Sequence, residues 1–390
     1  MKCTLRNILL LLLISPAAQA QDFSSILHSI EQHSTSLEAA RMETEADKQE
    51  SKLTTILEAP EVGLGYLWGN HGIGNRVDVD VSQQFDFPTL YAQKRQMAQE
   101  QRRVADLKYL NERQQLLLTA HKLCIEVVYC NALMDHLEED LAETRAMADS
   151  YEKLYQKGEA TIIDRHKAHQ AFLFFEAEYR EFHTLRNNLM EELRYMNGGE
   201  EVSITDTVFT HAPLPKDFQT WAGENLNRYP ELQLAQGQIT AQEKAVKVTR
   251  GEWLPKLSVG YMSEKEREDH YQGITLGLSI PIWSAGRKVK AAQAHLVAAQ
   301  MAEKDTRSRL ETQLRGIYNE ALQLQETYQA YHKHLTECDN APLLQKSLDA
   351  GQINLLTYLN ERQYVHEMHE KILEAERDLE LRKAELCVYE

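Results

Sequence analysis

The chain has 390 residues, of which 43% are apolar and 26% are charged, with 17 Gly and 9 Pro. It is too long and too apolar for a disordered tail. The mean hydropathy of −0.51 and the lack of an apolar run of about 18 residues beyond the N-terminal segment argue against a helical membrane protein. The net charge of −16 argues against nucleic-acid binding, because such proteins need a basic surface.

The N-terminal segment has the three parts of a secretory signal peptide. Lys2 and Arg6 precede the apolar run 8–14, and the small-residue sequence Ala18-Gln19-Ala20 follows it. We therefore predict a signal peptide over residues 1–20 and export of the mature protein. The alternative interpretation of this run is a buried core helix.

Two segments show the alternation that is typical of β-hairpins. In residues 60–87 and 254–283, apolar side chains alternate with polar or small ones, and a polar stretch interrupts each segment, at 69–76 and at 263–272. This alternation predicts strands with one apolar face and one polar face, joined by the polar stretches as loops. Shorter helices are expected before the hairpins, within residues 22–58 and 223–251.

Long helical stretches follow both hairpins. Neither Pro nor Gly occurs between Thr89 and Lys157, a span of about 100 Å as one helix. Apolar residues repeat every seven positions in two stretches, which is typical of coiled coils. The first repeat, interrupted by Arg186, consists of Phe172, Phe175, Tyr179, Phe182, Leu189, Leu193 and Met196; the second consists of Leu310, Leu314, Ile317, Ala321, Leu324, Tyr328, Tyr331 and Leu335. We interpret Gly158 and Gly351 as chain reversals, which gives helical hairpins over 90–197 and 287–389.

The two halves of the chain resemble each other. Pro60-Glu61-Val62-Gly63-Leu64-Gly65-Tyr66 matches Pro255-Lys256-Leu257-Ser258-Val259-Gly260-Tyr261, and a hairpin, a long helix, a glycine and a second helix follow in the same order. Two copies are too few for a solenoid, so a duplicated unit is the simpler interpretation. We therefore predict a first structural repeat over 21–220, which ends in a linker, and a second over 221–390.

Four cysteines remain after removal of the signal peptide: Cys124, Cys130, Cys338 and Cys387. Cys124 and Cys130 lie six residues apart on a predicted helix and cannot bridge each other. The sequence does not choose among the possible disulfides, and the simplest interpretation is that these residues are small buried hydrophobic groups.

The export signal and the aliphatic strand faces favour a β-barrel in a membrane over small sheets packed on helices. Four strands cannot close a barrel, for which about eight are needed, and open strand edges are not tolerated in lipid. Any barrel must therefore be shared between chains, with eight strands from two chains or twelve strands and a water-filled lumen from three. The residues predicted to face the lumen are Asp78, Asp80, Ser82, Thr275 and Ser279.

The repeated order of helix, P-x-x-x-x-G-Y strand, second strand, long helix, glycine turn and long helix, after a signal peptide, resembles the TolC-like outer-membrane efflux channel family. The resemblance covers essentially the whole mature chain and includes the linker Arg228-Tyr229-Pro230-Glu231-Leu232. It implies an α+β homotrimer in the outer membrane of a Gram-negative bacterium. A twelve-stranded barrel, with four strands from each chain, would continue into a periplasmic barrel of coiled-coil helical hairpins.

The resemblance also implies partners and a transport role without a cofactor. Family members connect to an inner-membrane pump, here expected to be of the RND type, through a periplasmic adaptor protein that meets the helical turns. The matching residues in this sequence are Lys157, Gly158, Thr161, Ile162, Gly351, Asn354 and Leu355. Heavy-metal ions are the substrate class that we favour, and multidrug or type I protein export remains open.

The sequence departs from the family at the predicted periplasmic entrance. Some members have acidic residues six and nine positions after the second turn glycine, where this chain has Thr357 and Asn360, followed by Glu361. In the first half Asp164 lies six positions after Gly158. These four residues are the gate candidates.

No motif of a nucleotide-binding loop, a serine hydrolase or a zinc protease occurs in the sequence, so we predict no enzymatic activity. Two histidine pairs at helical spacing are weak candidates for metal ligands: His166 with His169, and His366 with His369. Their alternative interpretation is polar positions on helices. The rival function from another class is an exported coiled-coil scaffold or adaptor without a pore.

Overall fold

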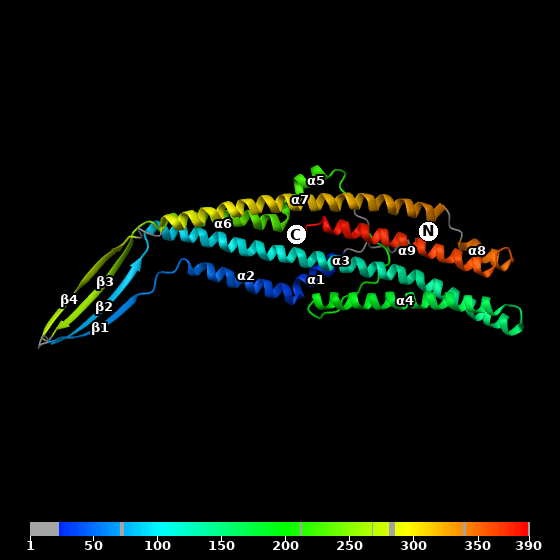
Figure 1. The fold of residues 1–390 in the computed structure, drawn as a ribbon, viewed down its shortest axis with the longest axis horizontal. Helices are drawn as coiled ribbons and strands as arrows, with labels where there is room; N and C mark the ends of the chain where they lie inside the picture. The colour runs from blue at the N-terminus through cyan, green and yellow to red at the C-terminus, as the bar shows by residue number, and fades with distance from the viewer. Residues whose placement is uncertain are drawn as a thin grey trace, which may run out of the picture. The chain divides into compact units, whose positions relative to one another are not determined.

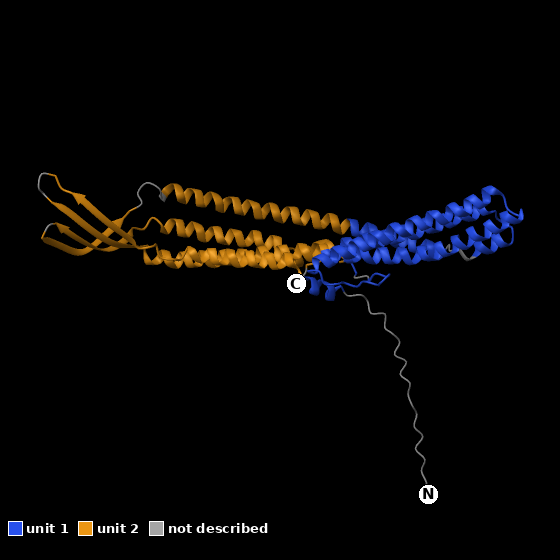
Figure 2. Ribbon diagram, turned by 90° about the horizontal axis from the view of Figure 1, so that it is seen from below, with its two compact units in different colours: residues 1–32, 120–214, 320–384 blue, residues 33–119, 215–319, 385–390 orange. Residues whose placement is uncertain are grey.

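The computed structural model describes residues 23–70, 74–210, 213–266, 268–280, 285–337 and 341–388. The predicted signal peptide lies outside these residues, as does Cys338. The chain forms two compact units (Figure 2): unit 1 comprises residues 1–32, 120–214 and 320–384, and unit 2 comprises residues 33–119, 215–319 and 385–390.

Helices dominate both halves of the chain, and each half contributes one strand pair (Figure 1). The elements are α1 (Ser24–His33), α2 (Thr35–Leu53), β1 (Glu61–Trp68), β2 (Asn75–Phe85), α3 (Pro88–Lys157), α4 (Ile162–Met196), α5 (Phe218–Asn225), η1 (Leu226–Arg228), α6 (Pro230–Gly251), β3 (Lys256–Glu266), β4 (Asp269–Ser279), α7 (Ala285–Glu337), α8 (Ala341–Asp349) and α9 (Leu355–Glu385). The predicted α+β class and the repeated order of hairpin and long helices are confirmed.

The 70-residue helix α3 confirms the prediction made from the lack of Pro and Gly. It contains an 18-residue window with a mean hydropathy of 1.4, of which 61% is buried within the chain. Burial of this kind is typical of a core helix, so the apolar character of α3 has a packing explanation. Cys124 and Cys130 lie in this buried part and are free thiols, which agrees with their interpretation as small buried hydrophobic groups, and burial raises the pKa of Cys124 to about 12. The same interpretation is wrong for Cys387, which is exposed.

The four strands form one antiparallel sheet in the order β1-β2-β3-β4, which belongs to unit 2. The prediction of a loop over 263–272 is wrong, because β3 continues to Glu266 and β4 begins at Asp269. Ser263 pairs with Gln272 and Lys265 with His270, so these polar residues extend the hairpin by four residue pairs, up to the pair of Glu266 with Asp269. Polar side chains at the end of a hairpin do not prevent ladder pairing, which involves the backbone.

The coiled-coil pattern of α4 is confirmed by burial. Phe175 and Leu193 are buried and the remaining positions of the repeat are half-buried. Arg186, which interrupts the repeat, donates hydrogen bonds to Asn131 Oδ1 and, at 3.3 Å, to the carbonyl oxygen of Ile204. The charge at this position therefore attaches α4 to α3 and to the segment after α4, instead of breaking the helix packing.

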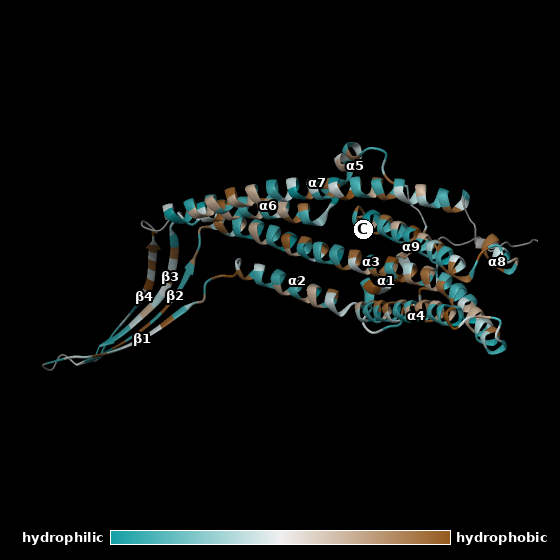
Figure 3. Cartoon of the chain, turned by 45° about the vertical axis from the view of Figure 1, so that its right-hand side comes forward, coloured by the Kyte–Doolittle hydropathy of each residue, from teal (hydrophilic) through white to brown (hydrophobic). Residues whose placement is uncertain are grey.

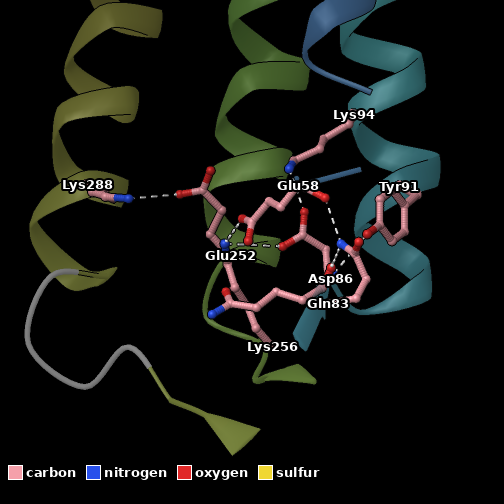
Figure 4. Close-up of polar contacts among 9 residues, drawn as sticks. Glu58, Gln83, Asp86, Tyr91, Lys94, Glu252, Lys256 and Lys288 are labelled. Atoms are coloured by element: carbon pink, nitrogen blue, oxygen red, sulfur yellow. Dashed lines mark hydrogen bonds and ion pairs between the residues drawn. The ribbon is translucent and has the colours of Figure 1, made fainter. Parts of the chain in front are cut away.

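A polar cluster holds the base of the sheet to the helices of unit 2 (Figure 4). Lys94 on α3 forms a 2.6 Å ion pair with Asp86, whose backbone N–H donates to Tyr91 Oη at 3.0 Å. Lys256 at the start of β3 contacts Glu58 and lies 3.7 Å from Asp86. Because Asp86 is only 7% exposed, it depends on these cations for its charge to be tolerated.

Replacement of Lys94 by Met is expected to destabilise the protein by about 1–3 kcal/mol, because it leaves the Asp86 carboxylate buried with the more distant Lys256 as its remaining partner. The matched control is Lys288→Met, which removes a 3.3 Å pair with Glu252 between exposed side chains and should cost less than about 1 kcal/mol. Thermal unfolding followed by circular dichroism measures both. Equal losses would contradict the role given to Asp86.

Candidate functional site

Both predicted chain reversals are built by the same backbone motif. Gly158 and Gly351 have φ values of +77° and +67°, a region that side-chain-bearing residues avoid. At each glycine the N–H groups of the glycine and of the next residue bond back into the preceding turn: Glu159 N–H donates to Leu154 O, and Gln352 N–H donates to Ser347 O, both at 2.9 Å. These are Schellman motifs, which end a helix and redirect the chain.

The helix that follows each glycine is capped at the same offset. Thr161 Oγ1 accepts from the backbone N–H of Asp164, whose carboxylate accepts from the N–H of Thr161 in return, which forms a capping box. In the second half Asn354 Oδ1 accepts from the N–H of Thr357 at 2.9 Å. Each cap lies three residues after its glycine, so the two reversals are structurally equivalent.

The predicted docking residues divide into an exposed set and one buried residue. Lys157, Gly158, Thr161, Ile162, Gly351 and Asn354 are exposed in the single chain. Leu355 is only 4% exposed and packs with Met147, Ala168 and Tyr358 from α3, α4 and α9. The side chain of Leu355 therefore anchors the turn to the helix core, whereas the neighbouring Leu356 is exposed.

The gate candidates lie at the first turns of α4 and α9. Asp164 and Thr357 are the capping partners described above, and Asn360 and Glu361 are exposed. Asn360 also lines a groove of about 400 Å³ between α3, α4 and α9. Their role at an entrance stays a prediction, because Asp164 and Thr357 already have a local structural function.

The strand register separates the sheet into two chemically different faces. The five predicted lumen residues share one face: Asp78 pairs with Gly65, Asp80 with Gly63, Ser82 with Gly260, Thr275 with Gly260 and Ser279 with Lys256. A Cβ at Gly63 would lie 2.1 Å from Asp80 Oδ1, so a side chain there would require the Asp80 carboxylate to move.

The opposite face of the sheet is apolar and exposed. It carries Val62, Leu64, Tyr66, Val77, Val81, Val259, Tyr261, Ile274, Leu276 and Leu278. Leu64, Ile274 and Leu276 are 79–81% exposed in the single chain. Figure 3 shows hydrophobic residues, in brown, along the strands. A contiguous apolar surface of this kind marks contact with lipid or with another protein.

A buried polar cluster joins α3, α4 and α9 within unit 1. His366, which is 2% exposed, lies between two carboxylates: its Nδ1 is 3.1 Å from Asp140 Oδ2 and its Nε2 is 3.2 Å from Glu178 Oε1. His136 Nε2 lies 3.5 Å from Asp140 Oδ2, and the His136 ring stacks on that of His369 with centroids 4.2 Å apart.

The carboxylates control the protonation of this cluster. Burial alone would lower the pKa of His366, but the hydrogen bonds and charges of Asp140 and Glu178 raise it to about 9. The pKa of Asp140 is lowered, because the contacts with His366, His136 and Arg362 outweigh the effect of burial. Burial lowers the pKa of His136. The cluster thus holds one imidazolium between two carboxylates, next to a neutral imidazole.

Of the two histidine pairs predicted as weak metal-ligand candidates, only one lies in the buried cluster. His366 and His369 belong to this cluster, whereas His166 and His169 are exposed on α4 and lie outside it. Two sets of metal-ligand atoms lie within 4.8 Å of one another among the described residues: His136 with Asp140 and His366, and Glu178 with His366 and Glu370. Sequence reasoning missed His136, Glu178 and Asp140, the last of which is only 2% exposed. The local signal for His136 and Asp140 was their i, i+4 spacing.

Replacement of Gly158 or Gly351 by Ala should destabilise the protein by about 1 kcal/mol, because alanine is strained at positive φ although the space is open. The matched control is Gly316→Ala in α7, where a Cβ also meets nothing within 4 Å and φ is not positive. This control should gain up to about 1 kcal/mol, since alanine favours a helix interior. Chemical denaturation curves of the three variants test the sign of each change. Losses of equal size at all three glycines would contradict the turn assignment.

The comparisons with known proteins agree with this architecture. Residues 221–388 match the family model described as outer membrane efflux protein. No curated protein sequence matches the chain.

Three solved structures illustrate the similarity of fold. A membrane protein from Pseudomonas aeruginosa superimposes with a TM-score of 0.76 at 12% identity, over 93% of this chain and 91% of that one. VceC from Vibrio cholerae gives 0.73 at 12% identity over 93% and 94%, and the CmeC outer membrane channel from Campylobacter jejuni gives 0.72 at 13% over 94% and 85%. The chain therefore has the fold of the TolC-like outer-membrane efflux channels, and residues 221–388 carry the sequence pattern of the outer membrane efflux protein family, which confirms the resemblance found in the sequence.

Proposed function

We propose that this chain is one subunit of a homotrimeric exit duct in the outer membrane of a Gram-negative bacterium. The observation that carries the proposal is the sheet, whose apolar face is exposed in the single chain and whose outer strands β1 and β4 each pair with one neighbour among the described residues. Three copies would supply twelve strands, enough for a barrel with a water-filled lumen. The polar face with Asp78, Asp80, Ser82, Thr275 and Ser279 would then line that lumen.

The duct performs no chemical step and has no energy source of its own. An inner-membrane transporter, expected to be of the RND type, would supply the work through a periplasmic adaptor protein. The adaptor contact is supported by the turns at Gly158 and Gly351, which are exposed and share one backbone motif. An adaptor could therefore bind both turns in the same way. Heavy-metal ions are the first substrate class to test, followed by multidrug and protein export.

Cell fractionation with gels of unheated samples tests location and subunit number together. A trimer in the outer-membrane fraction that dissociates on heating is the expected result. A monomer in the periplasmic fraction would contradict the duct and would instead support a coiled-coil scaffold without a pore.

Leu276→Lys tests which face of the sheet contacts lipid. A charge on a lipid-facing side chain near the bilayer centre should destabilise the barrel by about 2–4 kcal/mol, seen as a lower dissociation temperature of the trimer. The matched control is Thr275→Lys on the adjacent strand position of the opposite face, where an aqueous lumen should tolerate the charge. Reversed sensitivities of the two variants would show that the faces have been assigned the wrong way round.

A further inference from the structure

We propose that His136, Asp140 and His366 form a binding site for a divalent transition-metal ion of the Zn²⁺ type, which links α3 to α9 within unit 1. The donors are His136 Nε2, Asp140 Oδ2 and His366 Nδ1, and the fourth position is left to water. The proposal is independent of the duct, because it uses residues of one unit of one chain.

The spacing of the donors fits a tetrahedral ion. Asp140 Oδ2 lies 3.1 Å from His366 Nδ1 and 3.5 Å from His136 Nε2, and all three atoms lie within 4.8 Å of one another. Bonds of about 2.0–2.2 Å at tetrahedral angles place ligand atoms about 3.4 Å apart. An ion can therefore bind with small side-chain movements and no change of the backbone.

One of the proposed ligand atoms, His136 Nε2, makes no hydrogen bond within the part of the chain that the structure describes. This atom is buried, although it points towards Asp140. A buried polar atom without a partner is destabilising, and a ligand at this position would offset that cost.

The surroundings supply what a metal-bound histidine requires. Once His366 Nδ1 binds the ion in place of a proton, its Nε2–H still donates to Glu178 Oε1, the carboxylate partner that commonly orients a metal-ligating imidazole. Arg362 contacts the other oxygen of Asp140, which leaves Oδ2 for the ion. Of the three proposed ligands, His366 also lines a groove of about 620 Å³, together with Glu178 and Glu370.

The ligand chemistry selects the class of ion. Two imidazole nitrogens and one carboxylate oxygen suit Zn²⁺, Co²⁺, Ni²⁺ or Cu²⁺, whereas Ca²⁺ and Mg²⁺ prefer oxygen ligands. The competing interpretation is a purely structural cluster, in which the proton on His366 is never displaced.

The test uses the purified full-length mature protein in detergent, stripped with a chelator and dialysed against Zn²⁺, with the bound metal quantified per chain. We expect about one Zn²⁺ per chain, and tetrahedral Co²⁺ bands in the visible spectrum when Co²⁺ is used. His136→Gln should weaken binding at least about tenfold, and Glu178→Gln should weaken it by about tenfold to a hundredfold. The matched control, His166→Gln with His169→Gln, removes the exposed histidine pair and should bind like the wild type.

His136→Gln also keeps the experiment informative, since His136 Nε2 makes no hydrogen bond that the fold could lose and helix content is checked by circular dichroism. Binding by wild type and control that is lost in His136→Gln supports the site. Absence of bound metal in the wild type, or undiminished binding by His136→Gln, would overturn it. Neither result depends on where the protein lies in the cell or on how many copies assemble, so failure of the duct proposal is recognised separately.

Discussion

The proposed assembly depends on one constraint, the two open edges of the four-stranded sheet. Each chain supplies four strands in one antiparallel sheet, and within the described residues β1 and β4 pair on one side only. An unpaired strand edge in hydrocarbon costs several kcal/mol for each exposed backbone group. The exposed apolar face of the same sheet adds a second reason for association. The proposed trimer satisfies both needs at once, because the edge of one copy pairs with that of the next.

In the helical part, glycine is absent from the long helix α3 and occurs at the position where the chain reverses. The 70-residue α3 has no internal glycine, and the residue that ends its last turn is a glycine at positive φ. A side-chain cap three residues later starts the next helix in both halves of the chain. The two reversals thus use the same local chemistry at Gly158 and Gly351, which agrees with a duplicated unit.

The sequence predicted features that depend on neighbouring residues and missed those that depend on distant ones. Strand alternation, the length of α3 and the turn glycines are local properties, and the structure agrees with them. The loop over 263–272 was wrong because side-chain polarity does not report backbone pairing. The contact between Asp140 and His366 joins residues 226 positions apart, so no local pattern in the sequence could predict it. Arg186 disturbs the heptad pattern because it bonds to Asn131 and the backbone of Ile204, which no periodicity can show.

The measurement that tests the shared sheet most directly is oxidative cross-linking between its two edges in intact outer membranes. Leu64→Cys in β1 is combined with single cysteines placed along β4, from Asp269 to Ser279, so that one pair matches the register between copies. The account predicts a ladder of dimer and trimer that stops at the trimer, and no ladder when either cysteine is absent. Chains that stay monomeric at every position, or a ladder that continues beyond three copies, would contradict a barrel closed by three chains.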